Sequence, residues 1–411
     1  MTVQQSVINL MELVQSTAVE WKELGDVAKI SSGGTPKTGV SEYYGGDIPW
    51  LRTQEINFRD IWDTEIKITS QGIKNSSAKI IPANCVIMAM YGATVGKVGI
   101  NKIPLTTNQA CANIYLNNEI LNYRFIFHYL YHQYKYIKSL GTGSQTNINA
   151  QIVKSIKIPL PPLEIQEKIV KVLDKFTELE ATLEAELQLR RQQYNYYRDF
   201  LLNFDGREDV EWKRLGEVAL DFGRGKSKHR PRNDVRLYGG DIPFIQTGDI
   251  KDAGHIIDSY SQTYNELGLS QSKLWKKGTL CITIAANIAE TAILGFDACF
   301  PDSVIGFVAN PNKTTTYYVE YLLSNLKTKL QKKSMGSAQE NINLTTFNDF
   351  LFPFPPLSEQ ARIVAILDKF DTLTTSLTEG LPREIALRRQ QYEYYREQLL
   401  NFPRPTVKNA H

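Results

Sequence analysis

The sequence predicts an α+β fold in which two repeated mixed α/β domains are separated by two long helices that form an antiparallel coiled coil. Three observations support this prediction. Whole phrases recur about half a chain apart, strand-like runs alternate with turns between them, and each repeat ends in a stretch of helical periodicity. A period of that length makes each repeat a domain with its own helix. The predicted fold is therefore pseudo-twofold symmetric.

The repeat is visible in four phrases. YGGDIPW at Tyr44 returns as YGGDIPF at Tyr238, and EWKELGDVA at Glu20 returns as EWKRLGEVA at Glu211. The other two pairs are PLPPLEIQEKIVKVLDKF at Pro159 with PFPPLSEQARIVAILDKF at Pro353, and RRQQYNYYRDFLLNF at Arg190 with RRQQYEYYREQLLNF at Arg388. We expect a helical N-terminal segment over 1–19 near the coiled coil, a first domain over 20–160, a first spacer helix over 161–204, a second domain over 205–354, a second spacer helix over 355–402 and a tail over 403–411.

Each predicted element follows from local composition. Within the domains, β-branched and aromatic runs such as CVIMAMYGATVGKVGI and GTLCITIAANIAETAILGF are typical of strands. After Pro162 and Pro356, apolar residues recur every three or four positions, which predicts amphipathic helices. The first would be roughly 60 Å long at 1.5 Å per residue. Two matching helices favour mutual antiparallel packing, although packing of each helix on its own domain stays open.

The second helix carries extra residues between the shared LDKF and RRQQY phrases. Gly380 and Pro382 lie beside this extra length, and both residue types oppose a continuous helix. We therefore expect a break or bulge near Glu379 to Arg383.

Composition limits the class of protein. The chain has 411 residues, of which 42% are apolar, and this is enough for two or three globular domains. No apolar run reaches the length of a membrane span and no signal peptide is recognisable, so we expect a cytoplasmic protein. The four cysteines are scattered singly, which favours buried thiols over disulfides or a zinc site. A net charge of +3 means that any basic footprint is local.

Motifs for catalysis fail one by one. GKS at Gly225 resembles the end of a phosphate-binding loop, but Leu220 stands where that pattern requires glycine. No NPPY- or DPPY-type tetrapeptide of an amino-methyltransferase occurs, and Pro301-Asp302 lacks the rest of a nuclease motif. We therefore expect no catalytic residues and no metal site in this chain.

The polar loops beside the repeated YGGDIP phrase are the candidate DNA contacts. GRGKSKHRPRNDVR, from Gly223, concentrates basic residues in a Gly- and Pro-containing loop that suits phosphates, although a solvated charge run is the alternative. SSGGTPKTGV takes its place in the first copy. LRTQEI and IQTGDI follow the phrase, and Arg and Gln make bidentate contacts with guanine and adenine. GSQTNI and GSAQENI either contact DNA or cap helices.

Together these phrases resemble the specificity subunit, often called S or HsdS, of type I restriction-modification systems. The resemblance covers nearly the whole chain and includes ATVGKVGI and both RRQQYxYYR phrases. It implies two target-recognition domains that each read half of a bipartite, asymmetric DNA site, joined by a coiled coil that sets their spacing. It also implies partners: two methyltransferase (M) subunits that bind S-adenosylmethionine, and restriction (R) subunits that use ATP and Mg²⁺. No cofactor is expected in this chain.

The candidate residues form two groups. The candidate DNA contacts are Thr35, Lys37, Arg52, Thr53, Gln54, Lys97, Gln145, Asn147, Arg224, Lys226, Lys228, His229, Arg230, Arg232, Gln246, Thr247, Gln339 and Asn341. The candidate partner contacts are Tyr196, Tyr197, Tyr394 and Tyr395, because these Tyr-rich ends offer more aromatic surface than a two-helix seam buries. Two other functions stay open: a DNA-binding adaptor of another defence complex, and a stand-alone DNA-modifying enzyme.

Overall fold

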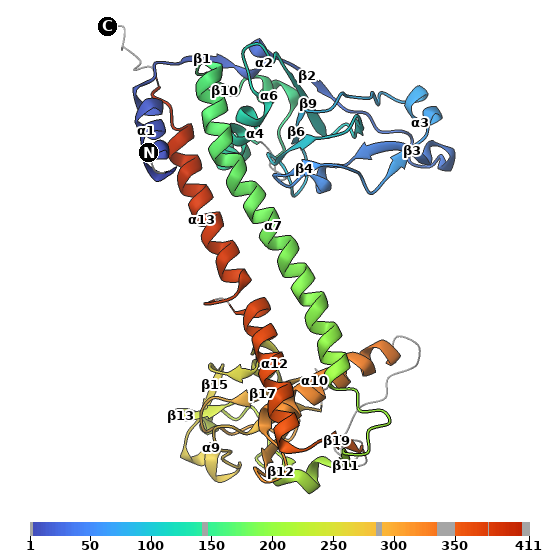
Figure 1. The fold of residues 1–411 in the computed structure, drawn as a ribbon, viewed down its shortest axis with the longest axis vertical. Coiled ribbons are helices and arrows are strands. Elements are labelled where there is room, and N and C mark those ends of the chain that lie inside the picture. The colour runs from blue at the N-terminus through green and yellow to red at the C-terminus, as the bar shows by residue number, and fades with distance from the viewer. Residues whose placement is uncertain (1–2, 142–146, 285–289, 335–349, 377, 405–411) are drawn as a thin grey trace. The chain divides into compact units, whose positions relative to one another are not determined.

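The chain folds into two compact units. This computed structural model describes residues 3–141, 147–284, 290–334, 350–376 and 378–404. One unit comprises Met1–Glu184 with Glu384–His411, and the other comprises Ala185–Arg383. Each unit therefore contains one copy of the repeated domain together with parts of the long helical segments (Figure 1).

The first domain is built on a five-stranded sheet with the strand order β2-β9-β6-β7-β4. Its strands are β2 (Ala28–Ser32), β4 (Asp60–Ile61), β6 (Val86–Ala89), β7 (Val98–Asn101) and β9 (Cys111–Leu116). Strand β4 pairs in parallel with β7, and the other neighbours in this sheet are antiparallel. Every residue of β6 and β7 is buried, which explains why these central strands have near-continuous apolar sequences.

A second sheet of the first domain carries the repeated YGGDIP phrase. It has the order β5-β3-β8 and contains β3 (Tyr44–Leu51), β5 (Lys67–Ile68) and β8 (Thr106–Thr107). The connecting helices are α2 (Leu24–Val27), η1 (Ser41–Tyr43), η2 (Thr53–Glu55), α3 (Ser70–Lys74), α4 (Tyr123–His132), α5 (Tyr134–Ser139) and α6 (Ala150–Lys154). Strand β1 (Glu20–Glu23) pairs antiparallel with β10 (Lys157–Leu160), so the two ends of the domain meet.

The second domain repeats this topology, except that an isolated bridge between Phe244 and Cys299 takes the place of β8. Its large sheet has the order β12-β18-β16-β17-β14, again with one parallel pair at the β14 edge, and β13 pairs with β15. The strands are β11 (Glu211–Lys213), β12 (Ala219–Arg224), β13 (Tyr238–Phe244), β14 (Ile256–Ile257), β15 (Gln262–Tyr264), β16 (Leu280–Thr283), β17 (Thr291–Leu294), β18 (Val304–Ala309) and β19 (Phe352–Phe354). The helices are η3 (Leu215–Val218), η4 (Val235–Leu237), α8 (Thr247–Asp252), α9 (Glu266–Ser270) and α10 (Thr316–Ser334). Pairing of β11 with β19 closes the domain.

The repeat extends to single hydrogen bonds at the start of each long helix. Buried Gln166 donates from its amide nitrogen to the carbonyls of Ile120 and Pro161. Buried Gln360 donates in the same way to the carbonyls of Lys313 and Pro355. Because a buried amide left without partners is costly, this shared glutamine fixes how each domain joins its helix.

Helix α7 (Leu163–Leu201) contributes to both units, and its two halves have different partners. In the first unit, Phe176 stacks on Tyr395 of α13 (Leu381–Leu400), with ring centroids 5.1 Å apart. In the second unit, Tyr197 stacks on Phe370 of α12 (Leu357–Thr375), with centroids 5.5 Å apart. The helices are antiparallel, because Glu180 and Glu184, further along α7 than Phe176, pair with Arg389, which precedes Tyr395. The coiled-coil prediction is confirmed.

The second long helical segment is broken between α12 and α13. Helix α12 ends at Thr375 and α13 begins at Leu381, so the interruption starts a few residues before the expected position. A Cβ on Gly380 would lie 2.3 Å from the carbonyl oxygen of Thr372, and Pro382 stands in the first turn of α13. Glycine is therefore required where the chain folds back closely, and proline suits a helix start.

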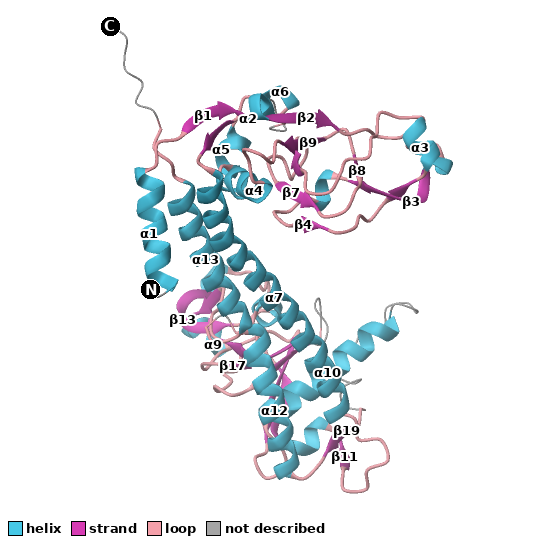
Figure 2. Ribbon diagram, turned by 45° about the horizontal axis from the view of Figure 1, so that its top comes forward, coloured by secondary structure: helices cyan, strands magenta, loops and turns pink. Residues whose placement is uncertain are grey.

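The C-terminal helix completes the core of the first domain. Leu399, Leu400 and Phe402 are buried in the same apolar cluster as the α4 and β6 residues. Helix α1 (Val3–Ser16) adds Leu10 and Val14 to this cluster and runs beside α13 (Figure 2). In the second unit, the end of α7 contributes the equivalent LLNF residues to its own domain. The repeated LLNF phrase thus completes both cores. In the first unit it comes from the far end of the chain, and in the second unit it comes from the helix just before the domain.

Candidate nucleic-acid interface

The repeated YGGDIP phrase forms a close turn at the start of a strand in each domain. Gly45 and Gly239 have φ values of +77° and +84°, in the left-handed region that favours glycine. A Cβ on Gly46 would lie 2.4 Å from the carbonyl oxygen of Ile68, and one on Gly240 would lie 2.5 Å from the Cα of Asn265. Both glycines are therefore required by geometry. We call this turn with its strand, β3 or β13, the frame.

An aromatic residue anchors each frame. Trp50 is buried and donates from its indole nitrogen to the carbonyl of Gly34 at 2.9 Å. Phe244 is buried in the second frame and stacks on Tyr264, with centroids 4.0 Å apart. Because each ring buries a large apolar area, the strand is held in a fixed position in its domain.

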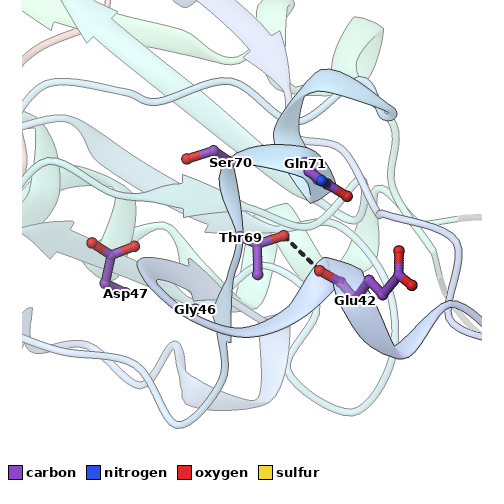
Figure 3. Close-up of a pocket in the computed structure, with 6 residues that line it drawn as sticks. All are labelled: Glu42, Gly46, Asp47, Thr69, Ser70 and Gln71. Carbon is purple, nitrogen blue, oxygen red and sulfur yellow. Dashed lines mark hydrogen bonds between the residues drawn. The ribbon is translucent and has the colours of Figure 1, made fainter.

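The outer side of the first frame is polar and partly acidic. A hollow of about 430 Å³ is lined by Glu42, Gly46, Asp47, Thr69, Ser70 and Gln71 (Figure 3). Its wall is closed by a hydrogen bond from the Thr69 hydroxyl to the carbonyl of Glu42. Asp47 and Glu42 make this hollow unsuitable for a phosphate, because they would repel it.

A carboxylate after each frame holds two backbone segments together. Glu55 accepts hydrogen bonds from the backbone N–H groups of Arg52 and Glu65, at 3.1 and 2.9 Å. Asp249 accepts from the backbone N–H groups of Gln246 and Ser261, at 2.8 and 3.2 Å. Residues 52 and 246 are therefore held identically in the two domains, while their side chains differ.

The side chain of Arg52 is engaged by acids. It forms ion pairs with Glu55 and with Glu65, and only 22% of it is exposed, against 70% of the Glu65 side chain. In the second domain, Gln246 donates to the amide oxygen of Gln262 at 2.6 Å. Thr53 and Thr247 begin the short helices that follow the frames, and Gln54 is exposed beside Arg52.

Three cations of the basic loop form an exposed row. Arg224, Lys226 and Lys228 are exposed, whereas Gly225 and Ser227 between them are buried, an alternation typical of extended chain. In the described part of the chain these three cations have no carboxylate within ion-pair distance. A Cβ on Gly225 would lie 2.2 Å from the carbonyl oxygen of Phe300, so the row lies tightly against its domain. We call these residues the cation row.

The other basic residues of this loop bind groups of the loop or, for Arg232, of the neighbouring Asp302. His229 and Arg236 both bind Asp234, and they hold the pKa of that carboxyl well below its usual range, with Arg236 as the larger cause. Arg232 pairs with Asp302, and Arg230 donates to the carbonyls of Ser227 and His229. The loop is therefore a built structure, unlike a solvated charge run.

Comparison with known proteins decides the family. The family model described as type I restriction modification DNA specificity domain matches residues 18–189 and 207–387. The chain belongs to this family. A type I restriction enzyme specificity subunit of Escherichia coli is 40% identical over 62% of this chain and 65% of that relative, so this alignment spans just under two thirds of the relative. A putative specificity subunit of Haemophilus influenzae is 32% identical over 96% of this chain and 98% of the relative.

Solved structures show the same fold. A crystal structure of the S subunit from M. genitalium has a TM-score of 0.56 and 16% identity, covering 95% of this chain and 98% of that one. A chain from a structure of type I complex assembly has a TM-score of 0.62 and 19% identity, covering 94% of this chain and 99% of that one. The fold of this chain is therefore that of these solved chains, and the family model places a DNA specificity domain in each half of it.

The Tyr-rich ends of this specificity subunit divide into two kinds of side chain. Tyr196 and Tyr394 are 65% and 56% exposed. Tyr197 and Tyr395 instead stack on the facing spacer helix, as described above for Phe370 and Phe176. Of the four predicted partner contacts, only Tyr196 and Tyr394 are therefore more than half exposed.

The remaining candidate contacts of the specificity subunit are scattered. Lys97 donates to Asn57, Asn147 accepts from the backbone of Gly92, Thr35 accepts from the backbone of Gln109 at 3.5 Å, and Lys37 is exposed. Gln145, Gln339 and Asn341 lie outside the described residues. Four residues of this surface were not predicted from the sequence: Glu55, Asp249, Glu65 and Gln262. The spacing of Glu55 and Asp249, three residues after the N-cap position, is that of a capping box and could have revealed them.

Among the described residues, no group of His, Cys, Asp or Glu side chains gathers as metal ligands, and no helix is long and apolar enough to cross a bilayer. The four cysteines are buried, and burial raises the pKa of Cys85 to about 11. These thiols are therefore structural, as their scattered positions indicate.

Proposed function

We propose that this specificity subunit contacts double-stranded DNA through both recognition domains, each on one half of a bipartite, asymmetric target. One observation carries the proposal: the two frames share their glycine turn and the same carboxylate brace, yet the side chains at the braced position differ, Arg52 in one and Gln246 in the other. A shared frame with different contacts is what recognition of two unlike half-sites requires.

Exchange of the domains tests this function. A chain in which the second domain, 205–354, replaces the first, 20–160, is expected to direct methylation to a site made of two copies of the second half-site. Sequencing of the methylated positions measures the outcome, with the unaltered chain as control. The proposal is wrong if the hybrid assembles and methylates but its target is unchanged. The boundaries 1–19, 20–160, 161–204, 205–354, 355–402 and 403–411 are part of the proposal and are supported by the β1–β10 and β11–β19 pairs.

We also propose that catalysis lies in partners. Two methyltransferase subunits would supply S-adenosylmethionine chemistry and restriction subunits the ATP- and Mg²⁺-dependent steps, in the cytoplasm where the target DNA lies. Exposed Tyr196 and Tyr394 are the docking contacts, because aromatic residues dominate binding hot spots. Replacement of both with Ala is expected to lower recruitment of methyltransferase subunits, measured as the mass of the complex in solution. Unaltered mass would remove these tyrosines from the interface.

The spacer helices set the distance between half-sites in this proposal. Contacts within each unit support it, since Arg389 and the Phe176–Tyr395 stack join the helices in the first unit and the Tyr197–Phe370 stack joins them in the second. Insertion of four residues after Leu183 and after Leu373 lengthens each helix by roughly 6 Å at 1.5 Å per residue. The unread spacer of the target is expected to grow by one or two base pairs, because DNA rises about 3.4 Å per base pair.

A further inference from the structure

Each frame presents a pair of side chains in which one supports the other. In the first domain, half-buried Arg52 holds Glu65, whose side chain is 70% exposed. In the second domain, half-buried Gln246 holds exposed Gln262 through a 2.6 Å hydrogen bond. In both domains the inner member follows the frame by one or two residues, and the outer member lies just before the facing strand β5 or at the start of the facing strand β15.

The two pairs occupy nearly the same place in the repeat. The backbone N–H of Glu65 binds the brace carboxylate Glu55, and the backbone N–H of Ser261 binds the equivalent Asp249. Glu65 therefore corresponds to Ser261, and Gln262 lies one position further along. The same carboxylate brace therefore fixes both pairs, although the outer side chain of the second domain stands one position later in the repeat than that of the first.

Arg52, the inner member of the first pair, is poorly placed to bind a base. The guanidinium of Arg52 lies between Glu55 and Glu65, and a bidentate contact with guanine would require it to leave one of these carboxylates. Glu65 can accept a further hydrogen bond without losing Arg52, since a carboxylate has about four acceptor sites. The inner member thus orients the outer one, which lowers the cost of ordering an exposed side chain when DNA binds.

The surroundings of Glu65 select the kind of DNA group that fits. A hollow of about 340 Å³ lies beside it, lined by Gln54, Glu55, Arg59, Asp60, Ile61, Trp62, Asp63 and Glu65. Four carboxylates in this set disfavour a phosphate and favour a hydrogen-bond donor. In the major groove, the donors are the exocyclic amino groups of cytosine and adenine, and Glu accepts from cytosine N4.

We propose that Glu65 and Gln262 are the side chains that contact a base edge in their half-sites, and that Arg52 and Gln246 position them. Glu65 accepts from the amino group of a cytosine, and Gln262 makes the bidentate contact that glutamine makes with the N6 and N7 of adenine. This inference rests on the proposed function of the two domains and deepens it.

Substitutions at the outer positions test the inference. In the full complex with methyltransferase subunits, Glu65→Gln is expected to reduce the preference for cytosine at one base pair of the first half-site about tenfold, within the range of one specific base contact. Gln262→Ala is expected to do the same for adenine at one base pair of the second half-site. Binding to a panel of single-base target variants measures both. Glu119→Gln, which removes an exposed carboxylate from the first domain away from the frame, is the matched control and leaves the panel unchanged.

The positioning role of Arg52 has its own readout. Arg52→Met is expected to weaken discrimination at the same base pair as Glu65→Gln, and Arg52→Lys, which keeps a cation beside Glu65, is expected to restore most of it. If Arg52 is itself the reader, Lys does not rescue and Glu65→Gln leaves that base pair unaffected, which overturns the inference. A wild-type complex without any half-site preference would instead overturn the proposed function.

Discussion

The two recognition domains are fastened to the spacer helices by the same device made from different residues. In the first domain, Arg124 on α4 lies between Asp60 on β4 and Asp174 on α7. In the second domain, His255, just before β14, lies between Glu320 on α10 and Asp371 on α12. Each is one cation between two carboxylates, linking sheet edge, domain helix and spacer helix. The difference is that the charge of arginine is permanent, whereas that of histidine depends on pH.

The surroundings of the two histidines set opposite protonation states. Burial lowers the pKa of His255, but the carboxylates of Asp371 and Glu320 outweigh burial and raise it to about 10. His128 of the first domain is completely buried, and burial lowers its pKa even though Asp174 accepts from it. His128 is therefore neutral, with its second ring nitrogen paired with the hydroxyl of Tyr392. We call each of these links between a domain and its spacer helix a junction. The junction of the second domain contains a charged histidine, and that of the first contains a neutral one.

Removal of the permanent cation is expected to destabilise the first unit strongly. Arg124 donates to Asp174 from two nitrogens and to Asp60 from a third, and only 14% of its side chain is exposed. Arg124→Met leaves both carboxylates without it, so we expect a loss of about 3 kcal/mol in the free energy of unfolding of the first unit. Urea unfolding measures this loss. The control is Tyr321→Phe, which removes one hydrogen bond to exposed Asp368 and is expected to cost about 1 kcal/mol. Equal losses would mean that Arg124 contributes no more than one hydrogen bond to an exposed carboxylate.

The stabilities of the two domains are expected to change with pH in opposite directions. The raised pKa of His255 stabilises the second domain fully below pH 6.5, and this contribution is lost as the pH rises from 6.5 towards 10, at about 1.4 kcal/mol per pKa unit. The lowered pKa of His128 acts in reverse, so the first domain loses stability as the pH falls through 6.5. Hydrogen exchange of α10 and α4, corrected for intrinsic rates, measures each domain separately. His255→Gln is expected to abolish the loss at high pH, and a loss that persists in this variant has another origin.

Some features of these two domains could be predicted from the sequence and others could not. The repeat predicted the spacer helices, the antiparallel pairing and the frames, because repeated phrases such as YGGDIP and PPL report local chemistry that one segment contains by itself. The partners of Arg124 and His255 come from elements more than 45 residues away in the chain, and nothing in single-sequence periodicity pairs Arg124 with Asp174. Contacts between charged residues that are distant in the chain were therefore not predicted, although the sequence contains each of these residues.

The candidate DNA contacts show the same limit. The basic loop was identified by composition, but composition does not say which cations are already paired. His229, Arg230 and Arg236 bind groups within the loop and Arg232 binds Asp302 outside it, so that of the basic residues in this described loop the cation row alone is without such a partner. Arg52 was predicted as a free guanine contact, and its engagement by Glu55 and Glu65 depends on a turn that the sequence pattern does not resolve. Whether Arg52 contacts DNA stays a prediction.

The cation row predicts that the two domains differ in their contacts with DNA phosphates. The equivalent loop of the first domain offers only Lys37, so the second domain is expected to supply more of the phosphate contacts. Substitution of Arg224, Lys226 and Lys228 by Gln should lower the slope of log K against log salt by about 2.7, at about 0.9 per phosphate. Lys37→Gln should lower it by about 0.9 at most. A DNA titration over a salt series measures both slopes, and equal slopes in the two variants would refute an unequal division.

The smallest expected difference lies on the spacer helices themselves. Arg389 of α13 binds Glu180 and Glu184 of α7, so it bridges the helix pair in the first unit, although half of its side chain is exposed. Its counterpart in the repeat, Arg191, is exposed and has no ion pair within the described part of the second unit, where Thr374 stands in the place of Glu180.

Arg389→Ala is therefore expected to destabilise the first unit by about 0.5 to 1 kcal/mol at low salt, while Arg191→Ala changes the second unit by less than the error of the measurement. The effect of Arg389 should fade at 1 M salt, where the Debye length is about 3 Å and an exposed pair is screened. Urea unfolding of both variants at two salt concentrations measures the difference. A salt-independent loss for Arg389→Ala would assign its role to packing of the aliphatic stem against α7, because long charged side chains also cover apolar surface.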